Sequence, residues 1–312
     1  MSTYVVTGGG GFIGSNIVRH LVEIGEEVRV IDDFSTGRRS NLEGIDDDIT
    51  LFEGDLCDPE ILNQAFQRAD YVLHQGAVPS VQRSVEDPVT SDRVNVGGTL
   101  KVLDAARKAS VKRVVYASSS SVYGDKPTLP KQEDMPPEPM SPYAASKLAG
   151  EYYCSVYSAT FDLPTVSLRY FNVFGPRQDP KSDYAAVIPI FTRCAIQGKQ
   201  ATVFGDGEQS RDFTYVDNVV QANLRAARAD TDGAVICNVG TGSRYTLNTL
   251  LEMLGELTGG KVERTYDDPR PGDVRHSEAD ITRAREHLGY EPSVSFEEGL
   301  ELTLEWYRKQ LG

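Results

Sequence analysis

The sequence predicts an α/β fold built on a doubly wound parallel sheet, with a second, smaller α/β lobe. Three observations lead to this prediction. Short apolar runs alternate with amphipathic stretches through the first half of the chain, a glycine-rich turn follows the first run, and an acidic residue ends the second. The chain has 312 residues, which is enough for two lobes because a domain commonly holds about 150.

The first element is a strand over residues 3–7 with the turn that follows it. Gly8, Gly11 and Gly14 lie in this turn, and an amphipathic helix pattern begins at once. Gly8 permits a tight turn, Gly11 lets backbone amides approach a pyrophosphate, and Gly14 lets the helix pack closely on the strand. The positive end of the helix dipole adds to this. We therefore expect a dinucleotide site of the Rossmann type.

The second strand, over residues 28–31, ends in Asp32. This acid lies about 20 residues beyond the last glycine, where a carboxylate binds a ribose hydroxyl. Asp32 favours NAD over NADP, because a carboxylate repels a 2′-phosphate. Arg38 and Arg39 argue the other way, and we interpret them as solvated charges of the loop that follows.

The third and fourth strands are predicted over residues 49–53 and 71–74. Asp55 follows the third strand and could meet an adenine amino group, and Gln75 follows the fourth. Since ligands of such sheets lie at the carboxyl ends of the strands, both residues are expected at the cofactor site.

A long helix over residues 88–110 and a fifth strand over residues 113–117 come next. The helix contains Asn95, which is either exposed, bonded locally, or directed to the cofactor. The strand runs into four serines, Ser118 to Ser121. Serine runs are most often loops, but this run begins at a strand end where a substrate is expected. The proline-rich residues 125–141 are expected to form an extended surface loop.

Ser141 and Pro142 have the pattern of a helix start, with serine as N-cap and proline in the first turn. Tyr143 and Lys147 follow at positions i and i+4, on one face of that helix. A phenol is a weak base near neutral pH, but a neighbouring ammonium and an oxidised nicotinamide both favour the phenolate. This pair is therefore predicted to carry the chemistry.

The bulk properties narrow the choice of partners. A net charge of −14 and a pI near 4.8 argue against nucleic acid or an anionic membrane. No apolar run approaches about 18 residues and no signal peptide precedes the first strand, so a cytoplasmic protein is expected. The four cysteines and four histidines are scattered, so neither disulfides nor a metal site is predicted.

The whole length of the chain resembles the extended short-chain dehydrogenase/reductase family, and within it the nucleotide-sugar 4-epimerases. The matching motifs are TGGGGFIGS, DDFSTG, GDL, SSSSVYG, SPYAASK, RYFNVFGPRQ, AVIPIF, FGDGEQSRDFTYVDN and RPGDVRHSEAD. The resemblance implies that Ser119, Tyr143 and Lys147 form the catalytic set. It also implies an NAD-binding domain over residues 1–172, with later segments such as 210–240 returning to it, and a nucleotide-sugar lobe over residues 173–312.

The resemblance further implies which residues line the two sites. Those expected at NAD are Gly8, Gly11, Phe12, Ile13, Gly14, Asp32, Asp33, Ser35, Thr36, Gly37, Asp55, Leu56, Gln75, Gly76, Ala77, Asn95, Tyr143, Lys147 and Tyr170. Those expected at the substrate are Ser80, Ser119, Ser120, Ser121, Asn172, Gln178, Ala185, Ala186, Val187, Phe204, Arg211, Arg270, Asp273 and Ser277. Phe204 offers an aromatic edge to a uracil, while Arg211 and Arg270 could grip the two phosphates.

The expected substrate is a UDP-hexose, with UDP-N-acetylglucosamine and UDP-N-acetylgalactosamine favoured and UDP-glucose and UDP-galactose also possible. Ser277 stands where galactose-only enzymes place a bulky tyrosine, which leaves space for an N-acetyl group. A dehydratase would carry Asp-Glu where Ser120 and Ser121 stand, and uronate 4-epimerases tend to have Thr in place of Asn172. UDP-glucuronate 4-epimerase, another dehydratase, decarboxylase or reductase of the family, and a non-enzymatic NAD sensor stay open as alternatives. A homodimer through the helices over residues 89–110 and 143–161 is expected.

Overall fold

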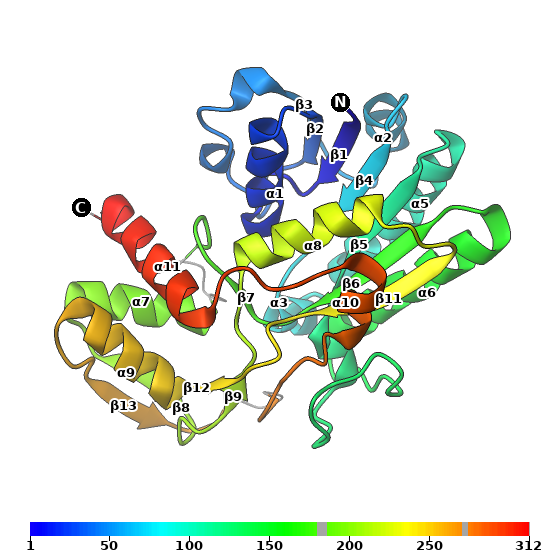
Figure 1. The fold of residues 1–312 in the computed structure, drawn as a ribbon. Coiled ribbons are helices and arrows are strands. Elements are labelled where there is room, and N and C mark those ends of the chain that lie inside the picture. Colours follow the sequence, from blue (N-terminus) through cyan, green and yellow to red (C-terminus); the bar gives the residue numbers. More distant parts are fainter. Residues whose placement is uncertain (180–185, 270–273, 312) are drawn as a thin grey trace.

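The computed structural model describes residues 1–179, 186–269 and 274–311. A seven-stranded parallel sheet forms its centre (Figure 1). The strands lie in the order β11 (Ala234–Val239), β6 (Thr165–Tyr170), β5 (Arg113–Ser119), β4 (Tyr71–His74), β1 (Thr3–Thr7), β2 (Glu27–Asp32) and β3 (Ile49–Glu53). The direction of chain progression reverses between β1 and β4, so ligands are expected beyond the carboxyl ends of these two strands. The predicted fold class is confirmed.

Helices cover both faces of this sheet. One face holds α1 (Phe12–Glu23), α8 (Val216–Arg228) and α10 (Thr282–Leu288), and the other holds α2 (Pro59–Ala65), α5 (Thr99–Lys108) and α6 (Pro142–Phe161). Neighbouring strand residues point to opposite faces, so Val6 packs beneath α1 while Val5 packs beneath α5. Both faces are buried, which explains why the strands are continuous apolar runs rather than alternating ones.

The helix predicted over residues 88–110 is present with a change of winding in its middle. It begins with α4 (Pro88–Asp92), continues as a π-helical segment (Arg93–Gly98), and ends as α5. A short helix α3 (Val81–Glu86) precedes it. Wider turns of this kind often occur at functional sites, and Asn95 lies within this one.

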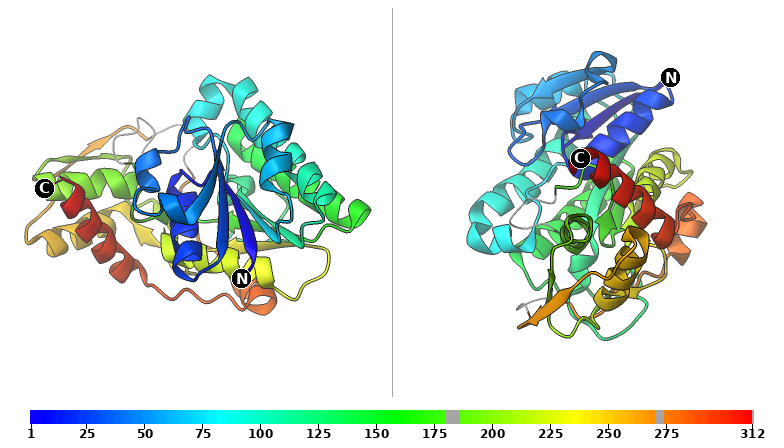
Figure 2. Two further views of the ribbon diagram at one scale, coloured as in Figure 1. Left: turned by 90° about the horizontal axis from the view of Figure 1, so that it is seen from above. Right: turned by 90° about the vertical axis from the view of Figure 1, so that its left-hand side faces the viewer.

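In the part that the structure describes, the second lobe contains three two-stranded sheets and three helices. The strand pairs are β7 (Val173–Phe174) with β10 (Thr214–Tyr215), β9 (Ser210–Arg211) with β12 (Tyr245–Thr246), and β8 (Ala201–Phe204) with β13 (Arg264–Asp267). The helices are α7 (Val187–Gln197), α9 (Leu247–Thr258) and α11 (Phe296–Leu311). Phe174, Phe213 and Phe296 pack together in its core. In both views of Figure 2 the α9 and β13 end lies away from β1 to β3.

Three short 3-10 helices complete the described elements, at Arg39–Asn41, Asp46–Asp48 and Ser120–Tyr123. The proline-rich stretch over residues 125–141 forms no regular element, as expected, but it is not wholly on the surface. Lys131 is buried and pairs with Ala279, and its amide donates to the Glu278 carbonyl across 2.7 Å. The loop therefore supports the segment that carries Ser277.

Candidate active site

The glycine turn between β1 and α1 leaves no room for side chains. Gly8 has a φ of +67°, and a Cβ there would lie 2.7 Å from the Gly76 Cα atom. A Cβ on Gly14 would lie 2.1 Å from the Gly8 carbonyl oxygen. Gly11 caps α1 without a side-chain hydrogen bond, and the first turn contains no acid. Backbone atoms and the positive end of the α1 dipole therefore face the region between β1 and β4 where the strand order reverses. This arrangement suits the binding of a pyrophosphate.

Asp32 is held in place by backbone amides at the end of β2. Its two carboxylate oxygens accept from Gly10 and Phe34, each across 2.8 Å. Burial raises the pKa of Asp32, and these two amides oppose that rise. The loop that contains Asp33, Ser35, Thr36 and Gly37 folds around the carboxylate, and a Cβ on Gly37 would lie 2.8 Å from an Asp32 oxygen. Each oxygen keeps a further lone pair for a ribose hydroxyl.

Charged groups around this loop are engaged with one another. Arg38 forms an ion pair with Asp179, and Arg39 forms one with Glu53. Both guanidinium groups are thus already paired with carboxylates. This supports NAD over NADP, because neither arginine is left to bind a 2′-phosphate. Asp55, expected near adenine, pairs with Arg93 across 2.8 Å and accepts from the Cys57 amide.

Gly76 and Ala77 follow β4, and the Gly76 backbone lies directly against Gly8 of the glycine turn, while Phe12 and Ile13 begin α1. Asn95 is buried, and its side-chain oxygen accepts from the Val78 amide across 2.8 Å. Its nitrogen donates to the Val78 carbonyl and to the Ser146 hydroxyl. Asn95 is therefore neither exposed nor bonded only within its own helix, because its side chain joins the loop after β4 to α6.

Ser119, Tyr143 and Lys147 converge at the carboxyl end of β5. Ser119 ends the strand and forms a hydrogen bond that counteracts the rise in the pKa of Tyr143 caused chiefly by burial. Lys147 Nζ donates to the Ala117 carbonyl across 2.8 Å and lies 5.8 Å from the centre of the Tyr143 ring. Burial lowers the pKa of Lys147 to about 8. The Tyr143 phenol therefore lies near the Ser119 hydroxyl and near the Lys147 amine, and the pKa of that amine is close to neutral pH.

Two further residues, Ser84 and His74, hold parts of this site in place and were not predicted from the sequence. Ser84, on α3, accepts from the Tyr143 amide across 3.0 Å and so fixes the start of α6. His74, the last residue of β4, is fully buried between the hydroxyls of Thr7 and Thr99, at 2.7 Å and 2.9 Å. Burial, with a smaller effect of Lys147, lowers the pKa of His74 to about 3. The sequence signal for both was only a polar residue within a buried stretch.

The expected substrate residues fall into two groups. Ser120 and Ser121 lie in the 3-10 turn after Ser119, and Ser121 donates to the Ser119 hydroxyl across 2.9 Å. Asn172 follows β6 and donates to the Ser277 hydroxyl and to the Asp212 carbonyl, both at 3.1 Å. Asp212 is a further residue that sequence reasoning missed, because its fully buried carboxylate accepts four hydrogen bonds from Thr241, Gly242 and Ala279.

The remaining expected substrate residues lie in the second lobe and at its border. Phe204 ends β8, and Arg211 ends β9 and donates to the Arg275 carbonyl. Ala186 is the N-cap of α7, and Val187 is its first residue. Ser80 caps α3, and Gln178 donates to the Val173 carbonyl. Ala185, Arg270 and Asp273 lie outside the described residues.

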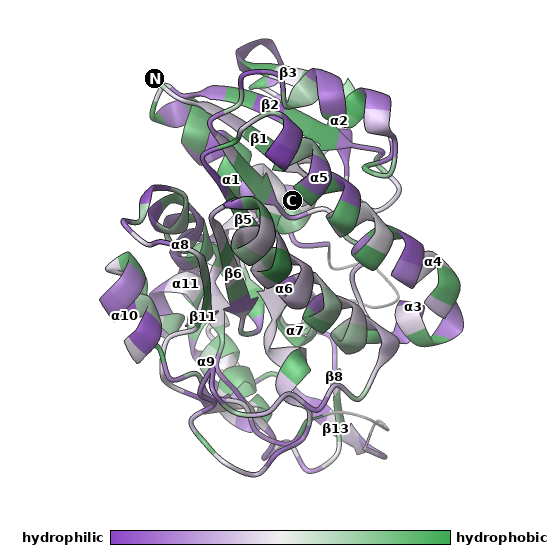
Figure 3. Ribbon diagram, turned by 90° about the vertical axis from the view of Figure 1, so that its right-hand side faces the viewer, coloured by the Kyte–Doolittle hydropathy of each residue, from purple (hydrophilic) through white to green (hydrophobic). Residues whose placement is uncertain are grey.

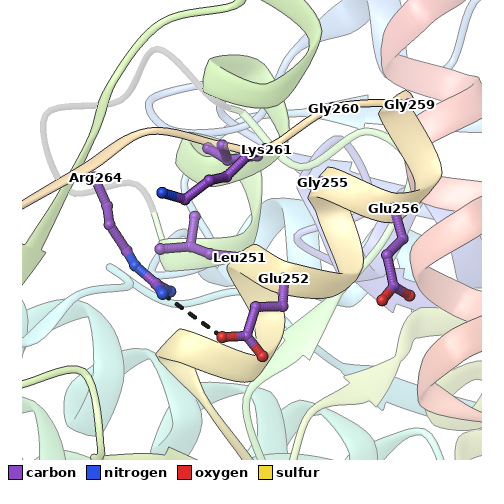
Figure 4. Close-up of a pocket in the computed structure, with 9 residues that line it drawn as sticks. Leu251, Glu252, Gly255, Glu256, Gly259, Gly260, Lys261 and Arg264 are labelled. Carbon is purple, nitrogen blue, oxygen red and sulfur yellow. Dashed lines mark ion pairs between the residues drawn. The ribbon is translucent and has the colours of Figure 1, made fainter.

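A surface hollow of about 590 Å³ lies elsewhere, between α9 and β13 (Figure 4). Its charged groups include Glu252 and Arg264, which form an ion pair at 3.6 Å, and Glu256 and Lys261. Neither the glycine turn nor Tyr143 lines it, so this hollow and the convergent polar groups do not coincide. We place the candidate active site at Ser119, Tyr143 and Lys147, because these side chains lie close enough together to take part in one proton transfer.

The fold and this site define a dinucleotide-dependent enzyme with a Ser-Tyr-Lys set. The family model described as "NAD dependent epimerase/dehydratase family" matches residues 4–240, and the chain belongs to that family. The predicted NAD cofactor and the predicted family are thereby confirmed. No helix among the described residues has the length and apolar character needed to cross a bilayer.

Three similar proteins illustrate the relationship. A UDP-glucose 4-epimerase of Mycolicibacterium smegmatis is 40% identical over 310 residues, which cover 98% of each chain. The crystal structure of a UDP-glucose 4-epimerase from Thermotoga maritima with UDP-glucose is 41% identical, with a TM-score of 0.95, and the match covers 99% of this chain and 100% of that one. A UDP-N-acetylglucosamine 4-epimerase from Methanobrevibacter ruminantium, in complex with UDP-N-acetylmuramic acid, is 40% identical with a TM-score of 0.95, covering 99% of each chain.

Proposed function

We propose that this protein interconverts UDP-hexoses at C4, and that UDP-N-acetylglucosamine and UDP-N-acetylgalactosamine are its favoured pair. UDP-glucose and UDP-galactose are accepted as smaller substrates. The observation that carries the reaction is the convergence of Ser119, Tyr143 and Lys147 at the carboxyl end of β5, beside the NAD cleft. The likeness to sugar 4-epimerases along the whole chain supports it.

The residues of this chain divide the work as follows. Tyr143 takes the proton of the sugar 4-hydroxyl, and Ser119 holds that hydroxyl in place by hydrogen bonding. NAD, when bound, accepts the hydride from C4 and gives it back. The Ser119 hydroxyl opposes the effect of burial on the pKa of Tyr143. The ammonium of Lys147, 5.8 Å from the centre of the Tyr143 ring, is assigned the role of favouring the phenolate during the reaction.

Epimerisation requires the hydride to return to the other face of C4. The nucleotide must stay anchored while the 4-keto sugar turns between the two transfers. We assign the anchoring to Asn172, Phe204 and Arg211, with Arg270 and Asp273 completing it, since these residues belong to the second lobe or to the segment that enters it. The catalytic pair instead lies on α6, which packs against the central sheet, so the sugar lies between the two lobes in this proposal. Residues 1–172 and the returning segment form the cofactor lobe in this proposal, and residues 173–312 otherwise form the sugar lobe.

The preference for N-acetylated sugars rests on Ser277. Its side chain is small and lies beside Asn172, so the volume that a large ring would fill is left to the substrate. A UDP-glucuronate 4-epimerase is the main alternative and would use the same proton and hydride transfers. Ser120 and Ser121 supply no carboxylic acid for elimination of water, which argues against a 4,6-dehydratase.

We also propose a homodimer through α3, α4 and α6. Apolar side chains on this face are exposed in the single chain, namely Val85 (63%), Val89 (78%), Tyr152 (58%) and Val156 (51%). The three helices pack on one another, and Figure 3 shows hydrophobic segments among the polar ones on this side. A second copy would cover them, because exposed apolar side chains gathered on one face favour association.

The experiment that tests the function is proton NMR of the purified protein with UDP-N-acetylglucosamine in heavy water, without added NAD. The expected result is UDP-N-acetylgalactosamine that carries no solvent deuterium, because the hydride returns within the site. Turnover of UDP-glucose or UDP-glucuronate alone would move the substrate and keep the reaction. A deuterated 6-deoxy-4-keto sugar would show a different reaction.

A further inference from the structure

Three polar side chains form a closed ring of hydrogen bonds at the carboxyl edge of the sheet. The Tyr170 hydroxyl donates to Gln75 Oε1 across 3.1 Å, and Gln75 Nε2 donates to Asn223 Oδ1 across 3.0 Å. Asn223 Nδ2 closes the ring by donating to the Tyr170 oxygen across 2.8 Å. Gln75 and Tyr170 were expected at the cofactor, whereas Asn223, on α8, was not.

The direction of every bond in this ring is set from α8. Asn223 Nδ2 also donates to the Val219 carbonyl across 2.8 Å, one turn earlier in the helix. A carbonyl oxygen only accepts, so the Asn223 amide can be oriented in one way. Its oxygen must then face Gln75, which must present its nitrogen there and its oxygen to Tyr170. The Tyr170 proton is consequently committed to Gln75.

This ring lies next to the catalytic residues. Tyr170 is the last residue of β6 and is in register with Ser119 of β5. Gln75 directly follows β4, on the other side of β5. The redox end of the cofactor must reach the same place as Tyr143, so Gln75 and Tyr170 form the wall beside it. We call these two residues the amide–phenol wall.

The ring leaves the wall with a defined hydrogen-bonding character. Within residues 1–179, 186–269 and 274–311, the second N–H of Gln75 has no hydrogen-bond partner, and the Tyr170 oxygen keeps one lone pair but no proton to donate. One donor beside one acceptor matches a carboxamide, which offers a C=O and an NH₂. Asn223 is fully buried and its side chain bonds to both residues of the wall, so we expect its effect on a ligand to pass through these two side chains.

We propose that Asn223 is a positioning residue for the nicotinamide carboxamide and determines how long NAD stays bound. It acts by fixing the polarity of the amide–phenol wall before the cofactor enters. This inference rests on the NAD cleft and concerns retention rather than the sugar, so it holds whichever UDP-hexose is turned over. A wall that is ordered in advance loses little entropy on binding, which slows dissociation.

The test measures release of the NAD that copurifies with the protein. Asn223→Ala removes the hydrogen bond to Tyr170 and lets the side-chain amide of Gln75 rotate by 180°. Tyr170→Phe removes the same hydrogen bond by deleting the hydroxyl that accepts it. Each change is expected to speed NAD release at least tenfold, the scale of one lost buried hydrogen bond. The double variant is expected to release NAD no faster than the quicker single one, because both changes break one unit.

A matched control lies on the same helix. Asn218 is equally buried on α8, but its side chain bonds to the backbone of Ser293 and Val294. Asn218→Ala should lower the melting temperature and leave NAD release unchanged. Exchange with the 3-acetylpyridine analogue of NAD, which has a methyl ketone in place of the carboxamide, provides the second measurement. The unaltered protein should discriminate against the analogue, and Asn223→Ala should reduce that discrimination.

The possible outcomes test the NAD site and the role of Asn223 separately. Unaltered protein that carries no NAD and takes none up would overturn the cofactor cleft and this inference together. Bound NAD with unchanged release in Asn223→Ala, additive effects in the double variant, or equal release from Asn218→Ala would overturn the role of Asn223 alone. Unchanged discrimination against the analogue would likewise refute the carboxamide assignment.

Discussion

Asn172 donates a hydrogen bond to the Ser277 hydroxyl across 3.1 Å, and this bond joins two segments that lie far apart in the sequence. Asn172 follows β6 at a positive φ of 31°, and Ser277 is nearly buried in the segment that pairs with Ser210. The same Asn172 amide donates to the Asp212 carbonyl. The position of Asn172 thus depends on the size of the side chain at 277.

Replacing Ser277 with tyrosine should reduce turnover of N-acetylated sugars more than turnover of plain ones. A phenol ring cannot occupy the space of a hydroxymethyl group without displacing Asn172, and it would fill the room proposed for the acetyl group. We expect kcat/KM to fall at least tenfold more for UDP-N-acetylglucosamine than for UDP-glucose, on the scale of pocket discrimination. Ser277→Ala is the control, because it removes the hydrogen bond without adding bulk. Equal losses on both sugars in Ser277→Tyr would exclude a size gate.

Replacing Tyr143 with phenylalanine should remove proton transfer while the cleft remains. We expect kcat to fall by about 10²–10⁴-fold, the range attributed to a positioned acid or base, with the bound NAD content unchanged. Tyr153→Phe is a suitable control, since Tyr153 lies on the same helix α6 and packs against the core beneath the sheet. Undiminished epimerisation by Tyr143→Phe would show that another group takes the proton.

The pKa of about 8 for Lys147 leads to a test with two opposite trends. Above pH 8 the folded protein loses this proton and with it the charge that favours the Tyr143 phenolate, so kcat/KM should fall. Stability should change the other way. The unfolded chain keeps the proton up to about pH 10.5, so between these values it binds more protons than the folded state and the free energy of unfolding rises with pH.

The matched variant for this test is Lys147→Arg, which stays charged beyond pH 12. Its activity is expected to be lower throughout, because a guanidinium fits the space of an ammonium poorly, but its profile should lack the decline above pH 8. Activity measured from pH 7 to 10 for both proteins, beside urea unfolding at each pH, gives the comparison. A decline that is the same in both proteins would assign it to another group.

The proposed dimer can be tested by placing charge on the exposed face of α6. Val156→Glu puts a carboxylate where apolar contact is expected, and a buried unpaired charge costs several kcal/mol. Light scattering after gel filtration should show a dimer for the unaltered protein and a monomer for the variant. Glu256→Gln, on the exposed side of α9, is a surface control that should leave the mass unchanged. A monomeric unaltered protein would refute the interface.

The sequence was most informative where local chemistry and chain geometry agree. The glycine turn, Asp32 and the Ser141 cap could be predicted because each depends on a few neighbouring residues, and the structure shows the Ser141 hydroxyl accepting from the Ala144 amide. Family resemblance was needed to single out Ser119 among four serines. Its place at the end of β5, in register with Tyr170, depends on the pairing of two strands that are far apart in the sequence.

Other features could not be predicted because their signal lies in tertiary contacts. His74 ends an apolar run, Asp212 lies in a largely polar segment and Asn223 lies in an amphipathic helix, and nothing in their sequence neighbours shows what they bond. The burial of Lys131 was unexpected for a proline-rich loop, and it follows from pairing with the segment after Ser277. Buried polar groups need partners, but the partner is known only once the sheet is assembled.

His74 provides a last test, which concerns stability rather than turnover. Its pKa of about 3 in the folded protein lies below the ordinary value of 6.5, so between pH 6.5 and 3 the unfolded chain binds a proton that the folded state does not. Stability should therefore fall as the pH falls through this range, by as much as about 5 kcal/mol for this one group if the shift is complete. Urea unfolding at constant ionic strength between pH 7 and 5 would measure the slope. His74→Asn should be less stable at pH 7, because Thr7 and Thr99 lose well-placed partners, yet its stability should depend less on pH. The difference between the two slopes isolates His74 from the many carboxylates, which titrate in both proteins, and parallel slopes would mean that the pKa of His74 is the same in the folded and the unfolded state.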